Sequence, residues 1–271
     1  MKLPVFATIG LAFKFFWRHR IQFYFLALPP VVISAVLFTL IGPKTFLNYY
    51  SPTLKSAGAG EFWSIELGLI TLLTTLIIFP LYTVAWHRSY LIPNEKITIG
   101  ACYRWQHRHW VFLWASLKML LLLVPVIIGG FFITGITSAA IPPLGIILMP
   151  ANIAILILCY ARFSLWLPAS AVDHKMDLPG IWDLTRGNGW RLVGILIFTS
   201  IATGVFDKIA GMLITGAANS LSIVGDLTQN LLSNLALFII TYAGMAIGIT
   251  ALSIAYKLLI EQKNRGFSYK K

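Results

Sequence analysis

The chain has 271 residues, of which 58% are hydrophobic and only 11% are charged, whereas a soluble domain carries about 25% charged residues. This composition excludes an ordinary soluble domain and predicts an all-α, multi-pass membrane protein. The net charge of +12 would suit nucleic acid or anionic lipid, but there is no soluble basic domain to hold nucleic acid. We therefore expect membrane lipids, and not nucleic acid, as the partner of the basic residues.

Six membrane-spanning helices are predicted from five stretches free of Asp, Glu, Lys and Arg, because a helix needs roughly 20 apolar residues to cross a bilayer. The longest stretch contains Pro142, Pro143 and Gly145, which indicate a tight turn between two antiparallel spans. The predicted spans cover residues 21–42, 63–86, 111–136, 142–167, 191–210 and 230–256.

The end of the fifth span is set by Asp207 and Lys208, which interrupt the apolar run near the far interface of the membrane. Residues 211–225 then form either a helical extension or a re-entrant segment. The sequence leaves both possibilities open.

The distribution of basic residues predicts the orientation, because cytoplasmic loops are enriched in Lys and Arg. Of the 21 Lys and Arg residues, 18 lie before the first span, after the last span, or in or next to the loops that follow the second and fourth spans, with Lys118 just inside the third span; the remaining three are Lys44, Lys55 and Lys208. Both chain termini are therefore expected on the cytoplasmic side.

An internal repeat precedes the spans. Residues 9–18 read IGLAFKFFWR and residues 99–108 read IGACYRWQHR, and a weaker third copy covers residues 181–190. The first two segments place two basic residues four positions apart, on one face of a helix and among aromatic residues. These pairs are Lys14 with Arg18 and Arg104 with Arg108.

We interpret the chain as one membrane domain, residues 1–271, built from three repeats at approximately residues 1–92, 93–176 and 177–271. Each repeat would be a cytoplasmic amphipathic helix lying in the interface, followed by a helical hairpin. The three interfacial helices are expected at residues 4–20, 97–109 and 178–190.

The third copy contains Gly187-Asn188-Gly189, between Arg186 and Trp190-Arg191. Glycine permits the positive φ that would turn the chain from along the membrane to across it. Alternatively, a lipid phosphate could bind to Arg186, Arg191 and the helix start. A nucleotide-binding loop is excluded, because neither G-x-x-x-x-G-K-[ST] nor G-x-G-x-x-G occurs here. We favour the turn.

Candidate site residues lie only at this predicted interface. No catalytic residues converge, and no cofactor is expected; His107 and His109 are two apart on a helix, too far apart in angle to share a metal. The candidates for contact with lipid headgroups are Lys14, Arg18, Arg88, Arg104, Arg108, Arg162, Arg186, Asn188, Trp190 and Arg191.

Residues 162–169 (RFSLWLPA) and 182–192 (WDLTRGNGWRL) resemble bacterial six-span proteins related to the membrane domain of glycerophosphoryl diester phosphodiesterases and to the YciC-like inner-membrane proteins. The resemblance implies a location in the bacterial inner membrane. It does not imply phosphodiesterase activity, because that family's catalytic domain is a separate soluble domain. His87-Arg88 differs from the family's H-R-G element, since Ser89 replaces the glycine.

Two functions are compatible with these features. The first is a non-enzymatic scaffold or lipid-contacting accessory protein, whose basic cytoplasmic face binds anionic lipid or a membrane-protein partner. The alternative is a transporter or lipid-handling permease with a path between the repeats. The middles of the predicted spans carry no charge, which disfavours an ion-coupled transporter.

Overall fold

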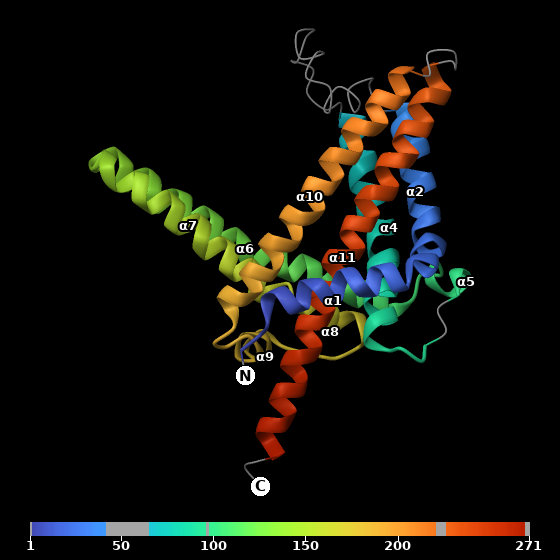
Figure 1. The fold of residues 1–271 in the computed structure, drawn as a ribbon. Coiled ribbons are helices and arrows are strands. Elements are labelled where there is room, and N and C mark those ends of the chain that lie inside the picture. The colour runs from blue at the N-terminus through green and yellow to red at the C-terminus, as the bar shows by residue number, and fades with distance from the viewer. Residues whose placement is uncertain (1, 42–64, 96–97, 221–225, 269–271) are drawn as a thin grey trace.

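The structure is a computed structural model that describes residues 2–41, 65–95, 98–220 and 226–268. Over these residues it is entirely helical, without strands (Figure 1), as the composition predicts. Five stretches are long and apolar enough to cross a membrane by length and composition: Arg20–Leu40, His107–Ala140, Pro142–Ala171, Gly189–Ile214 and Leu227–Arg265. The described part of the chain therefore has the helices of a multi-pass membrane protein.

The long helices form three consecutive antiparallel pairs, which match the predicted hairpins (Figure 1). The pairs are α2 (Arg20–Ile41) with α4 (Ile65–Leu91), α6 (His107–Ala140) with α7 (Pro142–Phe163), and α10 (Gly189–Ser220) with α11 (Asp226–Ser268).

The short helices gather at one end of the molecule, where the two chain termini also lie (Figure 1). They are α1 (Val5–Arg18), α5 (Ile99–Cys102), α8 (Trp166–Ala171) and α9 (Leu178–Leu184). We call this end the basal layer; it comprises residues 2–19, 92–95, 98–106 and 164–188. Only α11 continues well beyond it (Figure 1).

The predicted spans coincide with the long helices, with one correction. Helix α10 continues through Asp207 and Lys208 to Ser220, and its long apolar stretch ends at Ile214 and not at residue 210. The neighbouring helix accommodates the charge, since Thr241 Oγ1 donates to Asp207 Oδ1 at 3.4 Å. Residues 211–220 are thus a helical extension, while residues 221–225 lie outside the described residues.

The second predicted span, residues 63–86, corresponds to α4, which has 27 residues and packs against α2 and α11. It is not among the five stretches that satisfy the criteria of length and composition over the described residues. Residues 42, 63 and 64 of the predicted spans lie outside the described residues.

The tight turn predicted at the Pro-Pro-Gly sequence is confirmed. Helix α6 ends at Ala140 and α7 begins at Pro142, with proline in the first helical turn. Gly145 lets the two helices approach closely, because a Cβ at this position would lie 2.0 Å from Ser138 Oγ. Farther along the pair, Asn152 Nδ2 donates to the Gly130 carbonyl at 2.9 Å.

The contact between α4 and α11 forms one part of the buried core of the bundle. Trp86 is fully buried, and its Nε1 donates to the Ala246 carbonyl at 2.8 Å and to Thr250 Oγ1 at 2.9 Å. One turn earlier, the Tyr82 hydroxyl donates to the Tyr242 carbonyl at 3.2 Å. Small residues on α11 allow the aromatic side chains of α4 to reach its backbone. We call these contacts the α4–α11 seam.

The α6–α7 hairpin stands away from this bundle (Figure 1). It joins the rest of the protein mainly through contacts of α7 with α10 and of α6 with α4 and α8. Its apolar side chains are largely exposed, including Phe131, Phe132, Ile146 and Ile147. A hairpin with this surface requires an apolar surrounding.

The three predicted interfacial helices are not equivalent. Only α1 forms as expected, with 14 residues. Residues 97–109 are not one helix, because α5 has 4 residues and the Gln106 N–H donates to His109 Nδ1 at 2.9 Å, which starts a new helix. Arg104 lies in the bend between them and Arg108 lies in α6, so this pair does not share one helix face.

The third copy also differs from the prediction. Helix α9 has 7 residues and ends at Leu184, before Arg186. The prediction of a single helix over residues 178–190 is therefore wrong. Asp177 Oδ1 accepts from the Gly180 N–H at 2.9 Å and caps the start of α9.

Candidate functional site: the basic and aromatic basal layer

Helix α1 lies across α11 and the start of α10 (Figure 1) and has three distinct faces. Ala12 is buried against the protein. A second face is aromatic and exposed, because residues spaced four and seven apart share one side of a helix. This face carries Phe6, Phe13 and Trp17. The third face carries Lys14 and Arg18, both exposed. Such a helix can contact the protein with one face, lipid acyl chains with the second and water with the third.

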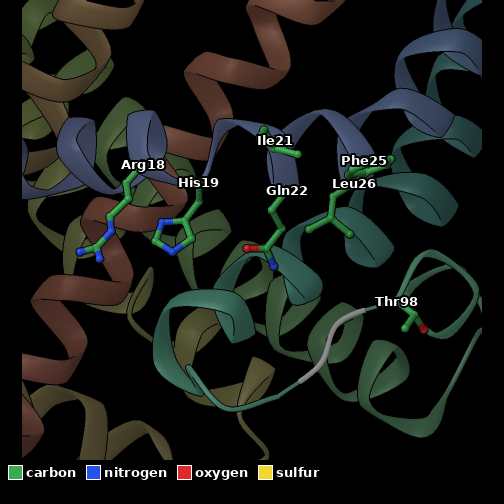
Figure 2. Close-up of a pocket in the computed structure, with 7 residues that line it drawn as sticks. All are labelled: Arg18, His19, Ile21, Gln22, Phe25, Leu26 and Thr98. Carbon is green, nitrogen blue, oxygen red and sulfur yellow. The ribbon is translucent and has the colours of Figure 1, made fainter.

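An open groove of about 510 Å³ lies at the junction of α1 and α2. Figure 2 shows Arg18, His19 and Gln22 projecting to the same side of this junction, with Thr98 opposite them. Ile21, Phe25 and Leu26 also line the groove. The groove thus combines one exposed cation with an apolar wall.

The elbow at residues 185–189 turns the chain from α9 into α10. Gly187 has a φ of 74°, which confirms the predicted positive φ at a glycine. Gly189 is needed for a different reason, because a Cβ here would lie 2.8 Å from Arg162 Nε and from Leu158 Cδ1. Both glycines therefore have structural roles in the turn.

The elbow also binds the N-terminal segment of the same chain. Asn188 is buried, and its Oδ1 accepts from the Leu3 N–H at 2.9 Å. Arg191 Nη1 donates to the Leu3 carbonyl at 2.7 Å. Of the two arginines that the phosphate interpretation would use, Arg191 is thus engaged by Leu3, which favours the turn interpretation. Arg186 remains exposed.

An ion-pair cluster links the ends of two long helices to the basal layer. Arg88 forms a bidentate pair with Glu95, with Nε to Oε2 at 2.7 Å and Nη2 to Oε1 at 3.0 Å. Arg88 Nη1 also lies 3.0 Å from Asp173 Oδ2, and Arg108 Nη1 lies 3.4 Å from Glu95 Oε1. The end of α4, the start of α6 and the segment after α8 are therefore held together by charge.

The two arginines of this cluster stabilise the ionised form of Glu95. Partial burial pushes the pKa of Glu95 upward, but hydrogen bonds and charge from Arg88, with a smaller effect from Arg108, bring that pKa below its ordinary value. The Arg88 side chain is only 12% exposed, so its guanidinium is occupied within the protein.

Two further side chains of reactive type, His87 and Cys102, are buried. His87 is buried, and its Nδ1 lies 2.7 Å from Ser253 Oγ in the α4–α11 seam. Burial, with a smaller contribution from the charge of Glu95, raises the pKa of the Cys102 thiol to about 11. This thiol is therefore protonated at neutral pH and is a weak nucleophile.

The ten candidate residues fall into two groups. Those engaged within the protein are Arg88, Arg108, Arg162, Asn188 and Arg191; among them, the Arg162 guanidinium lies 4.0 Å from the centre of a Trp182 ring. Those that are exposed are Lys14, Arg18, Arg104, Arg186 and Trp190. Only the second group is free in this structure to meet a ligand outside the chain.

The long apolar helices and the amphipathic basal layer define the class of a multi-pass helical membrane protein. Within the described residues, no group of three or more His, Cys, Asp or Glu side chains could hold a metal ion. No family model, curated protein or solved structure matches the chain. The resemblance of residues 162–169 and 182–192 to six-span bacterial proteins stays a prediction.

Proposed function

We propose that the chain is a non-enzymatic scaffold or accessory protein of a bacterial inner membrane, whose basal layer faces the cytoplasm and binds anionic lipid headgroups. In this proposal α4 is the sixth span, which is compatible with both termini lying at the same end (Figure 1). The bacterial location rests on the resemblance at residues 162–169 and 182–192.

One observation carries the proposal: exposed cations lie beside exposed aromatic side chains in the basal layer. Trp17 precedes Arg18 on α1, and Trp190, which is 63% exposed, follows Arg186 at the elbow. An indole ring sits favourably at the depth of lipid headgroups, while an arginine reaches outward to their phosphates. Each such cation contributes about 1 kcal/mol of attraction to an anionic membrane surface.

The lipid-handling permease is supported by a different observation. A groove of about 380 Å³ lies between α7 and α10, where the second and third helix pairs diverge. Its lining is almost wholly apolar and includes Pro150, Ile153, Val193 and Ile197, with Trp190 also contributing. This shape suits an acyl chain between two hairpins.

The scaffold proposal is tested by lipid retention. The purified protein is placed in nanodiscs of phosphatidylcholine mixed with a minority of phosphatidylglycerol, and retained lipids are counted by native mass spectrometry. We expect enrichment of phosphatidylglycerol. Replacing Arg18 and Arg186 with glutamine should reduce it about fivefold for each charge. Replacing Lys263 and Arg265, on the part of α11 beyond the basal layer, should leave it unchanged. Equal retention of both lipids would contradict the proposal.

A second assay separates the two functions. The protein is reconstituted into vesicles that carry fluorescent phospholipid in one leaflet, and movement of that lipid between leaflets is followed. The scaffold proposal expects the rate of empty vesicles. Faster movement that is lost when Ile153 and Val193 are replaced by tryptophan would support the permease and overturn the scaffold.

A further inference from the structure

A second amphipathic groove, separate from the one at α1 and α2, lies between α6 and α8. It has a volume of about 630 Å³. One wall comes from α6 and includes Val111, Trp114 and Lys118. The other wall comes from Trp166 on α8 and from residues 173–176, which follow that helix. We call it the α6–α8 groove.

The wall formed by residues 173–176 is held in place by several contacts. Asp173 adopts a φ of 59°, and the N–H groups of Asp173 and His174 close the end of α8 with hydrogen bonds to its carbonyls. The Asp173 carboxylate is held by Arg88 at 3.0 Å. Trp166 Nε1 donates to the Met176 carbonyl at 2.9 Å. The backbone that carries Lys175 into the groove is therefore well determined.

Lys118 is unusual in its position. It lies 11 residues after His107, the first residue of α6, or about 16 Å along the axis at ~1.5 Å per residue. It belongs to a helix that can span a membrane, and it is exposed. Its Nζ lies 5.9 Å from the centre of the Trp166 ring. An ammonium group on a membrane-spanning helix is costly without an anionic partner.

The ion pairs of the basal layer leave the charge of this groove positive. They join Arg88 and Arg108 to Glu95 and Asp173, and within the described residues none involves Lys118 or Lys175. The charge of Asp173 is thus offset by Arg88, while two ammonium groups remain to face a ligand. Beside them, Val111 and the exposed Trp114 offer an apolar wall on the outer side of a spanning helix.

We propose that the α6–α8 groove binds one anionic phospholipid. The lipid phosphate accepts hydrogen bonds from the ammonium groups of Lys118 and Lys175, and an acyl chain lies along Val111 and Trp114. Charge complementarity selects the anion, and the apolar wall selects a lipid over a free phosphate ion. The inference rests on the proposed function, because it adds a specific site to a surface that binds anionic lipid generally.

The site is tested with single charge-removing variants. Short-chain phosphatidylglycerol is titrated into the protein in a neutral detergent, and binding is followed by native mass spectrometry. We expect Lys118→Gln and Lys175→Gln each to weaken the tightest binding event about fivefold. Lys118→Arg should bind within about twofold of the parent, because the positive charge is kept. Lys263→Gln removes an exposed lysine from α11 and should leave binding unchanged.

The outcomes separate this inference from the proposed function. If the parent protein shows no preference for phosphatidylglycerol over phosphatidylcholine, the proposed function and the site both fail. If the parent shows the preference but Lys118→Gln and Lys175→Gln match Lys263→Gln, only the site is wrong. If inorganic phosphate displaces the lipid at equal concentration, the groove is a phosphate site and the lipid assignment is overturned. Unchanged elution and helical content of the variants exclude misfolding as the cause.

Discussion

The α4–α11 seam and the α6–α7 hairpin are both made of long apolar helices, yet they pack in opposite ways. In the seam, Trp86 and Tyr82 are buried and donate to carbonyls of the facing helix. In the hairpin, many large apolar side chains are exposed, and Asn152 links the two helices. Hydropathy alone does not distinguish these two regions.

The difference shows what assembles helices in an apolar solvent. Lipid chains are as apolar as leucine, so association depends on close approach and on hydrogen bonds between helices. Helix α11 offers Ala246, Thr250, Ser253 and Ala255, which are small and fully buried. The outer surface of the hairpin offers mainly large Leu, Ile and Phe side chains, which lipid can surround equally well.

Removing the central side chain of the seam should have the largest effect. Trp86→Ala deletes a fully buried indole and two hydrogen bonds, and we expect a loss of about 3–5 kcal/mol in the free energy of unfolding. Denaturation in mixed detergent micelles, followed by circular dichroism, measures the loss. Trp110→Ala, at a side chain that is 54% exposed on α6, is the matched control and should cost less than about 1 kcal/mol. Similar losses for both variants would contradict the contrast between the two regions.

The sequence predicts the parts of this fold that depend on local signals. The apolar runs locate the six long helices, although α10 ends at Ser220 and α11 at Ser268, beyond the predicted 210 and 256. The Pro-Pro-Gly turn and the positive φ of Gly187 are confirmed because each depends on a few adjacent residues. The sequence leaves open how the chain continues past Asp207, since the Thr241 hydroxyl that donates to its carboxylate belongs to another helix. Charge alone does not identify a helix end.

The candidate site is predicted less well, because exposure is a tertiary property. Basic residues at the interface look equivalent in the sequence, but Arg88 is taken up by Glu95 and by Asp173, which is 85 residues away. Arg191 is likewise taken up by the backbone of Leu3. The acidic residues could have indicated which arginines are engaged. The chain has only nine of them, so those near predicted interfacial arginines are candidate ion-pair partners. No sequence pattern indicates the α6–α8 groove, because residues 173–176 come close to Lys118 only in the folded structure.

The ion-pair cluster joins the two regions at their base, and its removal should be the second largest effect. Arg88→Gln leaves Glu95 partly buried without its main partner, and we expect a loss of about 2 kcal/mol. Replacing the exposed Arg104 with glutamine removes the same charge and should cost less than about 0.5 kcal/mol. Equal losses would show that overall charge, and not the cluster, is responsible.

The same cluster predicts a dependence on pH. The pKa of Glu95 in the folded protein lies below its ordinary value of 4.5, so its contribution to stability is present above that pH and is lost as the pH falls further. Glu95→Gln should therefore reduce the acid sensitivity of unfolding below pH 4.5, while the exposed Asp183 changed to Asn should not. Unfolding curves across this range measure the difference. A parent protein whose stability is as flat as that of Glu95→Gln would argue against the ion pair.

Release of the N-terminal segment from the elbow should have a smaller effect. Asn188→Ala removes the acceptor of the Leu3 N–H, which costs about 1 kcal/mol for a buried hydrogen bond. Because α1 follows Leu3 directly, hydrogen exchange should become faster over α1 and stay unchanged in the α4–α11 seam. Asn264→Ala, at an exposed position on α11, is the control. If exchange rises throughout the molecule, the contact stabilises the whole fold and not only the docking of α1.

The smallest effect is expected inside the hairpin. Asn152 Nδ2 donates to the Gly130 carbonyl at 2.9 Å and to Thr134 Oγ1, and hydrogen bonds between membrane helices are worth about 0.6 kcal/mol on average. Asn152→Leu keeps the branching at Cγ and removes both bonds, so the global free energy of unfolding should change by less than about 1 kcal/mol. Spin labels near the ends of α6 and α7 should nevertheless report a broader distribution of distances, because the tight turn at Ile141 would then be the main remaining constraint at the far end of the pair. Labels across the α4–α11 seam should be unaffected. If Asn152→Leu instead destabilises the protein as much as Trp86→Ala, the hairpin contributes to the core of the fold, and the distinction between an assembled bundle and a hairpin solvated by lipid would have to be abandoned.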